Sequence, residues 1–231
     1  PAEGAPAMAT SQSEVTERNY ENSSTQRTTV REAGDLESLA VSVVVDQRPV
    51  LAEDGTITFE SRQDELERLR DDLRMEQLPR HIECFDNSNI QGTNPASACV
   101  VFKNAKPSKS DYRKFTIKTV QGPNDFASME EVVYRRYRRL LEEGEELPQL
   151  IVIDGGKGQL SSALKSLEIL GLRGKIAIIG IAKRLEEIYF PEDSVPLYLD
   201  KRSETLKLIQ QLRNEAHRFS LKFHRQKRSA T

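Results

Sequence analysis

The sequence predicts an α/β fold in which one mixed sheet is flanked by helices. From residue 79 onward, three strand-like stretches follow one another with short polar links, as in an antiparallel meander. Two wholly apolar stretches, LIVID at 150–154 and KIAIIGIA at 175–182, then alternate with helical segments and are typical of buried parallel strands. With 37% hydrophobic and 30% charged residues, the 231-residue chain has the length and composition to bury a substantial core.

The strands of the meander are expected at 81–86, 97–104 and 112–120. HIECFD and SACVVFKN are largely apolar, YRKFTIKTV alternates apolar and polar residues, and the turn-rich NAKPSKSD joins the last two strands. A helix over about 127–142 follows. Its apolar side is expected to carry Val132, Val133, Tyr137, Leu140 and Leu141.

Helices and strands alternate after the meander. GGKGQ leads from the strand at 150–154 into a helix over about 157–170, which Gly171 ends. The strand at 175–182 is followed by a short strand at 186–190 and by a last helix over about 203–223. This order of elements is that of a ribonuclease-H-like sheet, an antiparallel three-strand meander extended by parallel strands.

The front of the chain is set apart from this domain, which we place at 79–231. Residues 1–37 are polar and are predicted to be disordered, because they hold too little apolar surface to fold alone. Residues 38–78 form a small appendage. It consists of a strand at 39–45, a hairpin turning at Asp54-Gly55, and a helix that begins with the capping pattern SRQD and carries Leu66, Leu69 and Leu73.

The charge distribution and the lack of a recognisable targeting signal limit the functions to be considered. Residues 1–80 carry 17 acidic and 9 basic residues, a balance of −8, whereas residues 81–231 carry 19 and 25, a balance of +6. A basic body suits phosphate-rich partners, although a solvated surface has the same composition. No apolar run is long enough to cross a bilayer and PAEGAPAMATSQ does not resemble a signal peptide, so we expect a cytoplasmic protein.

The two cysteines are expected to be small buried residues. Cys84 and Cys99 each lie in a predicted strand, no CxxC pair is present, and nothing indicates a zinc site or a disulfide.

Two aspartates stand at the ends of predicted strands. Asp86 ends the first strand and Asp154 the fourth, and in this topology those strands lie side by side. Carboxylates that converge at a sheet edge suit a hard divalent cation, which would polarise a phosphate and activate water. The alternatives are a turn residue for Asp86 and a helix N-cap for Asp154.

His217 is the third candidate. It lies in the last predicted helix, in RNEAHRF, among basic side chains that could follow a DNA backbone: Arg213, Arg218, Lys222, Arg225, Lys227 and Arg228. A solvated basic helix end is the alternative. His224 and His81 are not favoured.

Two further residues have a functional and an ordinary interpretation. Asp125, in GPNDF, is either a helix N-cap or the start of a first helical turn, or else an additional acidic residue of the site. Lys157, in GGKGQ, either contacts a phosphate or is solvated. GGKGQ is not a Walker A loop, because Gly158 stands where Ser or Thr is needed.

Several long blocks, in order, resemble the endonuclease domain of the UvrC family. They cover residue 79 to about 229 and include IECFDNSNIQGT, GPNDFASMEEVVYRRYRR, LPQLIVIDGGKGQL, IIGIAKRLEEIYFP and LRNEAHRFSLKFHRQKRS. The resemblance implies a ribonuclease-H-like DNA endonuclease of nucleotide excision repair. It would use Mg²⁺ or Mn²⁺ and cut on the 5′ side of a lesion, with UvrB as partner and UvrA upstream. It places the catalytic and metal-binding set on Asp86, Asp154 and His217, with Asp125 as a further acidic residue.

Two alternatives remain at this point. One is another Asp-Asp-His nuclease of ribonuclease H fold, such as a Piwi-like guided nuclease. The other is a DNA-binding or docking module that is inactive in isolation, because the GIY-YIG, UvrB-binding and helix-hairpin-helix regions of the family are not visible in this sequence.

Overall fold

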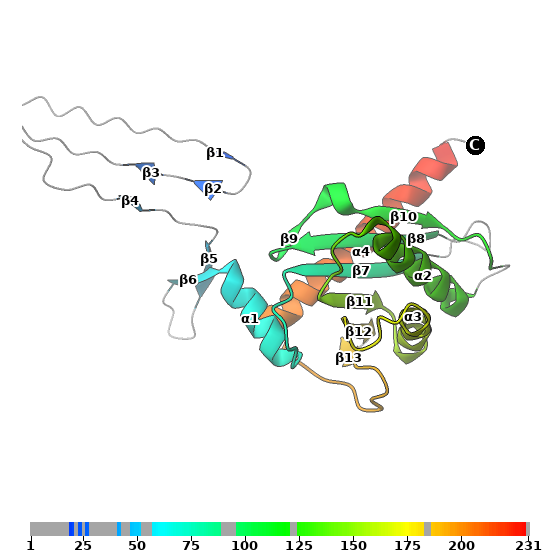
Figure 1. The fold of residues 1–231 in the computed structure, drawn as a ribbon. Helices are drawn as coiled ribbons and strands as arrows, with labels where there is room; N and C mark the ends of the chain where they lie inside the picture. The colour runs from blue at the N-terminus through cyan, green and yellow to red at the C-terminus, as the bar shows by residue number, and fades with distance from the viewer. Residues whose placement is uncertain are drawn as a thin grey trace, which may run out of the picture. The chain divides into compact units, whose positions relative to one another are not determined.

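The computed structural model of the chain is shown in Figure 1. It describes the backbone of residues 19–20, 23–24, 26–27, 41–42, 47–51, 57–88, 96–120, 124–182 and 186–229. It describes side chains over residues 61–87, 96–120, 124–182 and 186–221. The chain divides into two compact units, Pro1–Arg62 and Gln63–Thr231.

The first unit contains three short antiparallel pairs of strands. They are β1 (Asn19–Tyr20) with β2 (Ser23–Ser24), β3 (Gln26–Arg27) with β4 (Val41–Ser42), and β5 (Gln47–Leu51) with β6 (Ile57–Ser61). The β5–β6 pair confirms the predicted hairpin. Its register pairs Leu51 with Ile57, and the predicted turn at Asp54-Gly55 lies outside the described residues. Most of the segment predicted to be disordered, residues 1–37, lies outside the described residues.

The second unit is built on one mixed sheet (Figure 1). Its strand order is β10-β8-β7-β11-β12-β13, and β9 pairs with β8 outside this path. The strands are β7 (His81–Ser88), β8 (Ala96–Lys103), β9 (Lys106–Pro107), β10 (Arg113–Thr116), β11 (Leu150–Asp154), β12 (Ala177–Ala182) and β13 (Glu187–Tyr189). β7, β11 and β12 are parallel, and the remaining pairs are antiparallel. The predicted α/β class with a meander followed by parallel strands is therefore confirmed.

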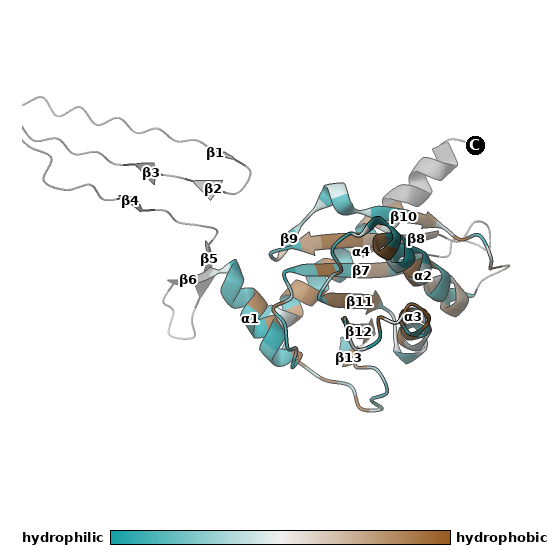
Figure 2. Cartoon of the chain, in the orientation of Figure 1, coloured by the Kyte–Doolittle hydropathy of each residue, from teal (hydrophilic) through white to brown (hydrophobic). Residues whose placement is uncertain are grey.

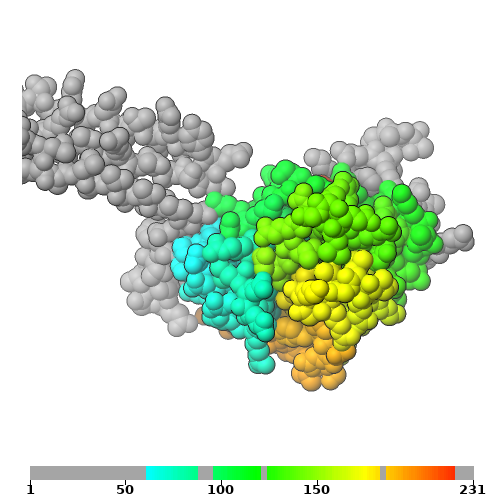
Figure 3. Space-filling model, in the orientation of Figure 1, coloured from blue at the N-terminus to red at the C-terminus, as the bar shows by residue number. Residues whose placement is uncertain are grey.

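Four α-helices accompany the sheet: α1 (Arg62–Asp72), α2 (Asp125–Glu143), α3 (Lys157–Ile169) and α4 (Glu204–Ser229); a short 3₁₀ turn, η1, spans Lys109–Asp111. α2 and α3 pack side by side on one face of the molecule, in green and yellow in Figure 3. In the described part of the chain, no helix has both the length and the apolar character of a membrane span.

The two faces of the sheet carry different helices. Alternate residues of β7 point to opposite faces. Glu83 contacts Arg136 of α2, whereas Asp86 contacts His217 of α4, so α2 covers one face and α4 the other. The central strand β11 is buried along its whole length, and β8 and β11 are coloured as apolar strands in Figure 2.

Helix α1 contributes to the core of the second unit. The sequence left open whether residues before 79 pack on the domain. Leu66, Leu69 and Leu73 are each at most 3% exposed and belong to the same core cluster as the strands.

The strand predicted at 112–120 was too long. β10 ends at Thr116, whose partner Ala96 is the first residue of β8. After Thr116, the backbone is hydrogen-bonded to the side chain of Glu131 of α2. Its carboxylate accepts the backbone N–H groups of Lys118 and Thr119 at 2.9–3.1 Å.

The predicted helices are present with small differences. α2 begins at Asp125, where Asn124 caps it by accepting the N–H of Ala127, and it ends at the left-handed Gly144. Four of the five residues assigned to its apolar side are buried or nearly so, but Leu141 is 44% exposed and was wrongly placed there. α4 runs to Ser229, beyond the expected end at 223.

Candidate active site

Asp86 and Asp154 lie side by side on adjacent parallel strands. β11 pairs with β7 in the register Ile153↔Phe85, and one further step places Asp154 opposite Asp86. Residues at the same level of parallel strands point to the same face, at a strand spacing of about 4.8 Å. The two aspartates are only 1% and 3% exposed, so two carboxylates are gathered at one buried edge of the sheet.

His217 of α4 lies next to Asp86. Its Nδ1 lies 3.3 Å from Oδ2 of Asp86, and its side chain is 52% exposed. α4 carries this imidazole across the face to which both carboxylates point. The site therefore combines two buried carboxylates, Asp86 and Asp154, with the partly exposed imidazole of His217.

The ordinary interpretations of the two aspartates do not hold. Asp86 is not a turn residue, because β7 continues to Ser88 and Asp86 pairs with Ala98 inside the ladder. Asp154 does not cap α3, because Gly156 occupies the N-cap position.

A glycine on β12 makes room for the turn after Asp154. A Cβ placed on Gly180 would lie 2.8 Å from the carbonyl oxygen of Gly155 and 3.3 Å from Cβ of Leu160. The absence of a side chain thus lets the Gly155–Gly156 turn cross β12 at close range. Gly155 directly follows Asp154, the last residue of β11.

Asp125 lies at a neighbouring position, at the start of α2. Its backbone carbonyl accepts a 2.9 Å hydrogen bond from Nδ2 of Asn87, the residue after Asp86. Its side chain is exposed, and it lines a hollow of about 460 Å³. The lining residues are Asn124, Asp125, Phe126, Gly156, Lys157, Gly158 and Gln159. Asp125 is therefore linked to β7 through the side chain of Asn87.

Comparisons with known proteins decide the family. Residues 70–221 match a family model described as the UvrC RNAse H endonuclease domain. The chain belongs to this family. The UvrABC system protein C of Christiangramia forsetii is 79% identical over 164 residues, which are 71% of this chain and 28% of that protein. The corresponding protein of Flavobacterium johnsoniae is 75% identical over 162 residues, 70% of this chain and 27% of that protein.

The chain thus spans about a quarter of the length of these curated relatives. Among solved structures, Ciona intestinalis Endonuclease V in complex with a 24mer DNA containing an inosine followed by a ribo-adenosine is 22% identical with a TM-score of 0.35, and the match covers 66% of each chain. A second family model, described as Flagellar M-ring protein C-terminal, matches residues 1–75, less than half of the chain.

The donor set of this UvrC endonuclease domain fits a divalent cation in chemical type. Two adjacent buried carboxylates supply hard oxygen ligands, and an imidazole stands at the open side. Within the described ranges, however, no group of three or more His, Cys, Asp or Glu side chains is arranged to hold a metal ion. The structure brings Asp86 and His217 into contact and sets Asp154 beside them, without closing a ligand shell.

The basic residues predicted to contact DNA are only partly described. Lys157 is exposed, but its Nζ donates to the carbonyl of Ser194 at 2.5 Å and lies 5.1 Å from the ring centroid of Tyr189. Arg218 makes a double hydrogen bond to Glu215. The side chains of Arg225, Lys227 and Arg228 lie outside the described residues, although α4 continues through these positions.

A buried ionic network on the opposite face of the sheet was missed from the sequence. Glu83 is fully buried, and its carboxylate accepts hydrogen bonds from Arg136 at 2.5 Å and from Tyr137 at 2.9 Å. Burial alone would raise the pKa of Glu83, but hydrogen bonds from His81 and Arg136 outweigh it and lower the pKa to about 2. The position of Glu83 inside the largely apolar stretch HIECF could have indicated a buried carboxylate that needs a partner. Cys99 is a buried cysteine beside this carboxylate, and Cys84 is buried as well, as predicted.

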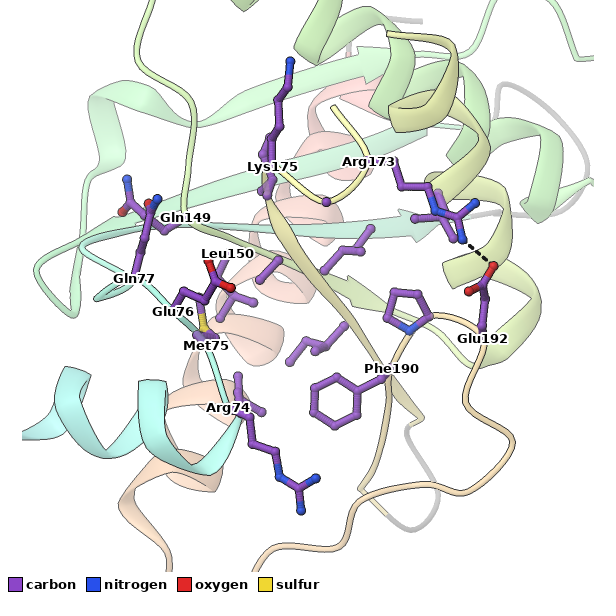
Figure 4. Close-up of a pocket in the computed structure, with 18 residues that line it drawn as sticks. Arg74, Met75, Glu76, Gln77, Gln149, Leu150, Arg173, Lys175, Phe190 and Glu192 are labelled. Atoms are coloured by element: carbon purple, nitrogen blue, oxygen red, sulfur yellow. Dashed lines mark hydrogen bonds and ion pairs between the residues drawn. The ribbon is translucent and has the colours of Figure 1, made fainter. Parts of the chain in front are cut away.

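A hollow of about 650 Å³ lies at the other end of the same strands (Figure 4). It is lined by Leu150 and Ala177, the first residues of β11 and β12, and by an ion pair between Arg173 and Glu192. Leu150 and Asp154 are four positions apart on β11, about 13 Å at the rise of a strand. This hollow is therefore separate from the candidate active site.

Proposed function

We propose that the chain is a divalent-metal-dependent endodeoxyribonuclease that cuts a DNA strand on the 5′ side of a lesion. The observation that carries this proposal is the adjacency of Asp86 and Asp154, with His217 in contact with Asp86. Membership in the UvrC endonuclease family supports DNA as the substrate and favours this function over a guided nuclease. The products of such hydrolysis are a 3′-hydroxyl and a 5′-phosphate.

Asp86, Asp154 and His217 would hold Mg²⁺ or Mn²⁺. When bound, such a cation supplies positive charge for the scissile phosphate and lowers the pKa of a coordinated water. Buried carboxylates hold their charge in a setting where water cannot screen it, so they attract a cation strongly. The metal would also relieve the repulsion between the two neighbouring aspartates.

The half-exposed imidazole of His217 has one of two roles. It either completes the ligand set or transfers a proton at the reacting phosphate, which a histidine does well because its unperturbed pKa lies near neutrality. Its contact with Asp86 orients the ring in both cases. Asp125, at the start of α2, would be a further acidic residue at the edge of the site.

The DNA strand would run along basic residues on two sides of the site. These are Lys157 near the turn after β11 and, on α4, Arg218, Arg225, Lys227 and Arg228. The name of the curated relatives supports a place in the UvrABC system, with UvrB as the direct partner on damaged double-stranded DNA, UvrA acting upstream, and the cytoplasm as compartment.

Nicking of a lesion-bearing duplex tests the proposal. The duplex is pre-nicked on the 3′ side and loaded with UvrB, and the wild-type chain is compared with Asp154→Ala and His217→Ala in Mg²⁺ or Mn²⁺. A 5′-side nick that both variants lose is the expected result. If the wild type binds Mn²⁺ but does not nick, the chain holds an intact catalytic core that needs other regions for activity. If it binds no metal either, the site assignment fails.

A further inference from the structure

Phe126 is an exposed aromatic residue next to the candidate active site. It follows Asp125 in the first turn of α2, and 55% of its surface is accessible. The other large hydrophobic residues with a comparable exposed fraction, among the described side chains, are Leu141, Ile169, Val195, Tyr198 and Leu221, and none of them lines the 460 Å³ hollow that contains Asp125. An exposed phenylalanine at the rim of a candidate site therefore needs its own explanation.

The ring of Phe126 lies against a glycine of α3. A Cβ placed on Gly158 would lie 2.4 Å from Cε1 and 2.9 Å from Cζ of Phe126. Any other residue at 158 would displace the ring, so Gly158 provides the space that it occupies. The ring is thus supported on one side by the backbone of α3, while much of its surface stays open to solvent.

We infer that Phe126 is a stacking platform for an unpaired nucleobase of the DNA strand that enters the site. This inference rests on the proposed endonuclease function and names how the substrate strand is held. Aromatic rings bind bases of any sequence through their π faces, and Phe126, which is 55% exposed, leaves ring surface open to a base. The neighbouring Asp125 carboxylate repels phosphates, so a base rather than the backbone is the suitable partner for this ring.

Stacking on Phe126 requires a base that is not stacked inside a duplex. In an intact duplex, both faces of every internal base are covered by its neighbours, so a protein ring can stack only on a base that has left the helix or lacks a partner. Leaving the helix costs least for damaged or mispaired bases. Phe126 would therefore favour strands with an unstacked nucleotide beside the scissile bond.

The test uses the full chain and an oligonucleotide that carries a fluorescent adenine analogue, whose emission is quenched by stacking. A chelator keeps the DNA intact, and single-stranded and fully paired forms are compared. We expect Phe126→Leu, which keeps an apolar side chain but removes the ring, to abolish the quenching and to weaken single-strand binding roughly tenfold. Phe126→Tyr, which keeps an aromatic ring, should retain both the quenching and the single-strand affinity of the wild type. Duplex binding stays within about twofold, because it is dominated by phosphate contacts.

Ile169→Ala is the matched control. Ile169 is 67% exposed and is the last residue of α3, about 17 Å from Gly158 at the rise of an α-helix. It should leave quenching and affinity unchanged. Equal quenching in Phe126→Leu and wild type would overturn the inference, as would an equal loss of affinity for duplex and single strand.

Nicking assays on the same variants separate this inference from the proposed function. A wild-type chain that nicks DNA, with a Phe126→Leu variant that binds single strands equally well, rejects the stacking platform alone. A wild-type chain that neither nicks nor binds any of these DNAs rejects both.

Discussion

His217 on the last helix lies 3.3 Å, between Nδ1 and Oδ2, from Asp86 on the first strand of the sheet. The two residues are 131 positions apart in the chain. Their contact forms only when α4 docks on the face of the sheet to which Asp86 points. The apolar side of α4, which includes the buried Leu208, Ile209 and Leu212, provides that docking. Assembly of the site is thus coupled to completion of the domain.

The first prediction concerns His217. His217→Ala should reduce nicking at least about a hundredfold, whether the ring binds metal or moves a proton. Stability should hardly change, because half of the side chain is exposed. His224→Ala is the matched control, since it removes the same side chain from the same helix. Nicking rates and melting temperatures measured together check the prediction, and an equal loss in both variants would contradict it.

The second prediction concerns the adjacent carboxylates. In metal-free buffer, Asp154→Asn should stabilise the fold by about 1–3 kcal/mol, because it removes one of two like charges about 5 Å apart. The same variant should lose both nicking and the rise in melting temperature that Mn²⁺ gives the wild type. Thermal unfolding with and without Mn²⁺ measures this. A variant that Mn²⁺ still stabilises as it does the wild type would place the metal elsewhere.

Much of the fold could be predicted from local sequence patterns. The wholly apolar LIVID had to be a buried central strand, and it is β11, flanked by parallel β7 and β12. The end of the third strand could not be predicted in this way. Its alternating pattern continues to residue 120, but the strand stops at Thr116, and the backbone N–H groups of Lys118 and Thr119 donate to Glu131 of α2 instead. A tertiary contact, not local propensity, determines the conformation there.

The candidate site was predictable to the extent that topology brings strand ends together. Two aspartates predicted at the ends of neighbouring parallel strands were expected to lie close together. The family resemblance implied His217 as the third residue of the site. The buried Glu83–Arg136 pair and the Phe126–Gly158 contact each join residues on different elements, and no local pattern marks either pair. Residues far apart in the chain become partners only through the tertiary arrangement.

The third prediction concerns the buried ion pair. Glu83→Gln should destabilise the domain by about 3–5 kcal/mol near neutral pH, because it leaves the Arg136 guanidinium without its counter-charge. Glu142→Gln is the control. It breaks an exposed pair with Arg138 and should cost less than about 1 kcal/mol. Denaturant unfolding of both variants measures the difference. Similar losses would show that the buried pair contributes no more than a surface pair.

The fourth prediction concerns acid. The pKa of Glu83 is about 2 in the folded chain, below the value of about 4.3 for an unperturbed glutamate. A lowered pKa stabilises the fold fully above about pH 4.3, and this contribution disappears as the pH falls toward 2. The stability difference between wild type and Glu83→Gln should therefore shrink by about 3 kcal/mol over that interval. Unfolding curves at several pH values test this, and a difference that does not depend on pH would refute it.

The fifth prediction concerns the glycine that accommodates the turn after Asp154. In Gly180→Ala, the added methyl would meet the Gly155 carbonyl at 2.8 Å and Cβ of Leu160 at 3.3 Å, and a backbone oxygen cannot rotate away as a flexible side chain can. We expect a loss of about 1–3 kcal/mol and slower nicking, because the end of β11 must shift and Asp154 with it. Gly156→Ala is the stability control, since an added methyl there meets nothing within 4 Å. Melting temperatures of the two variants, followed by nicking rates of Gly180→Ala at a temperature where it is fully folded, separate a displaced carboxylate from a weakened fold. If folded Gly180→Ala nicked at the wild-type rate, the turn would not control the position of Asp154.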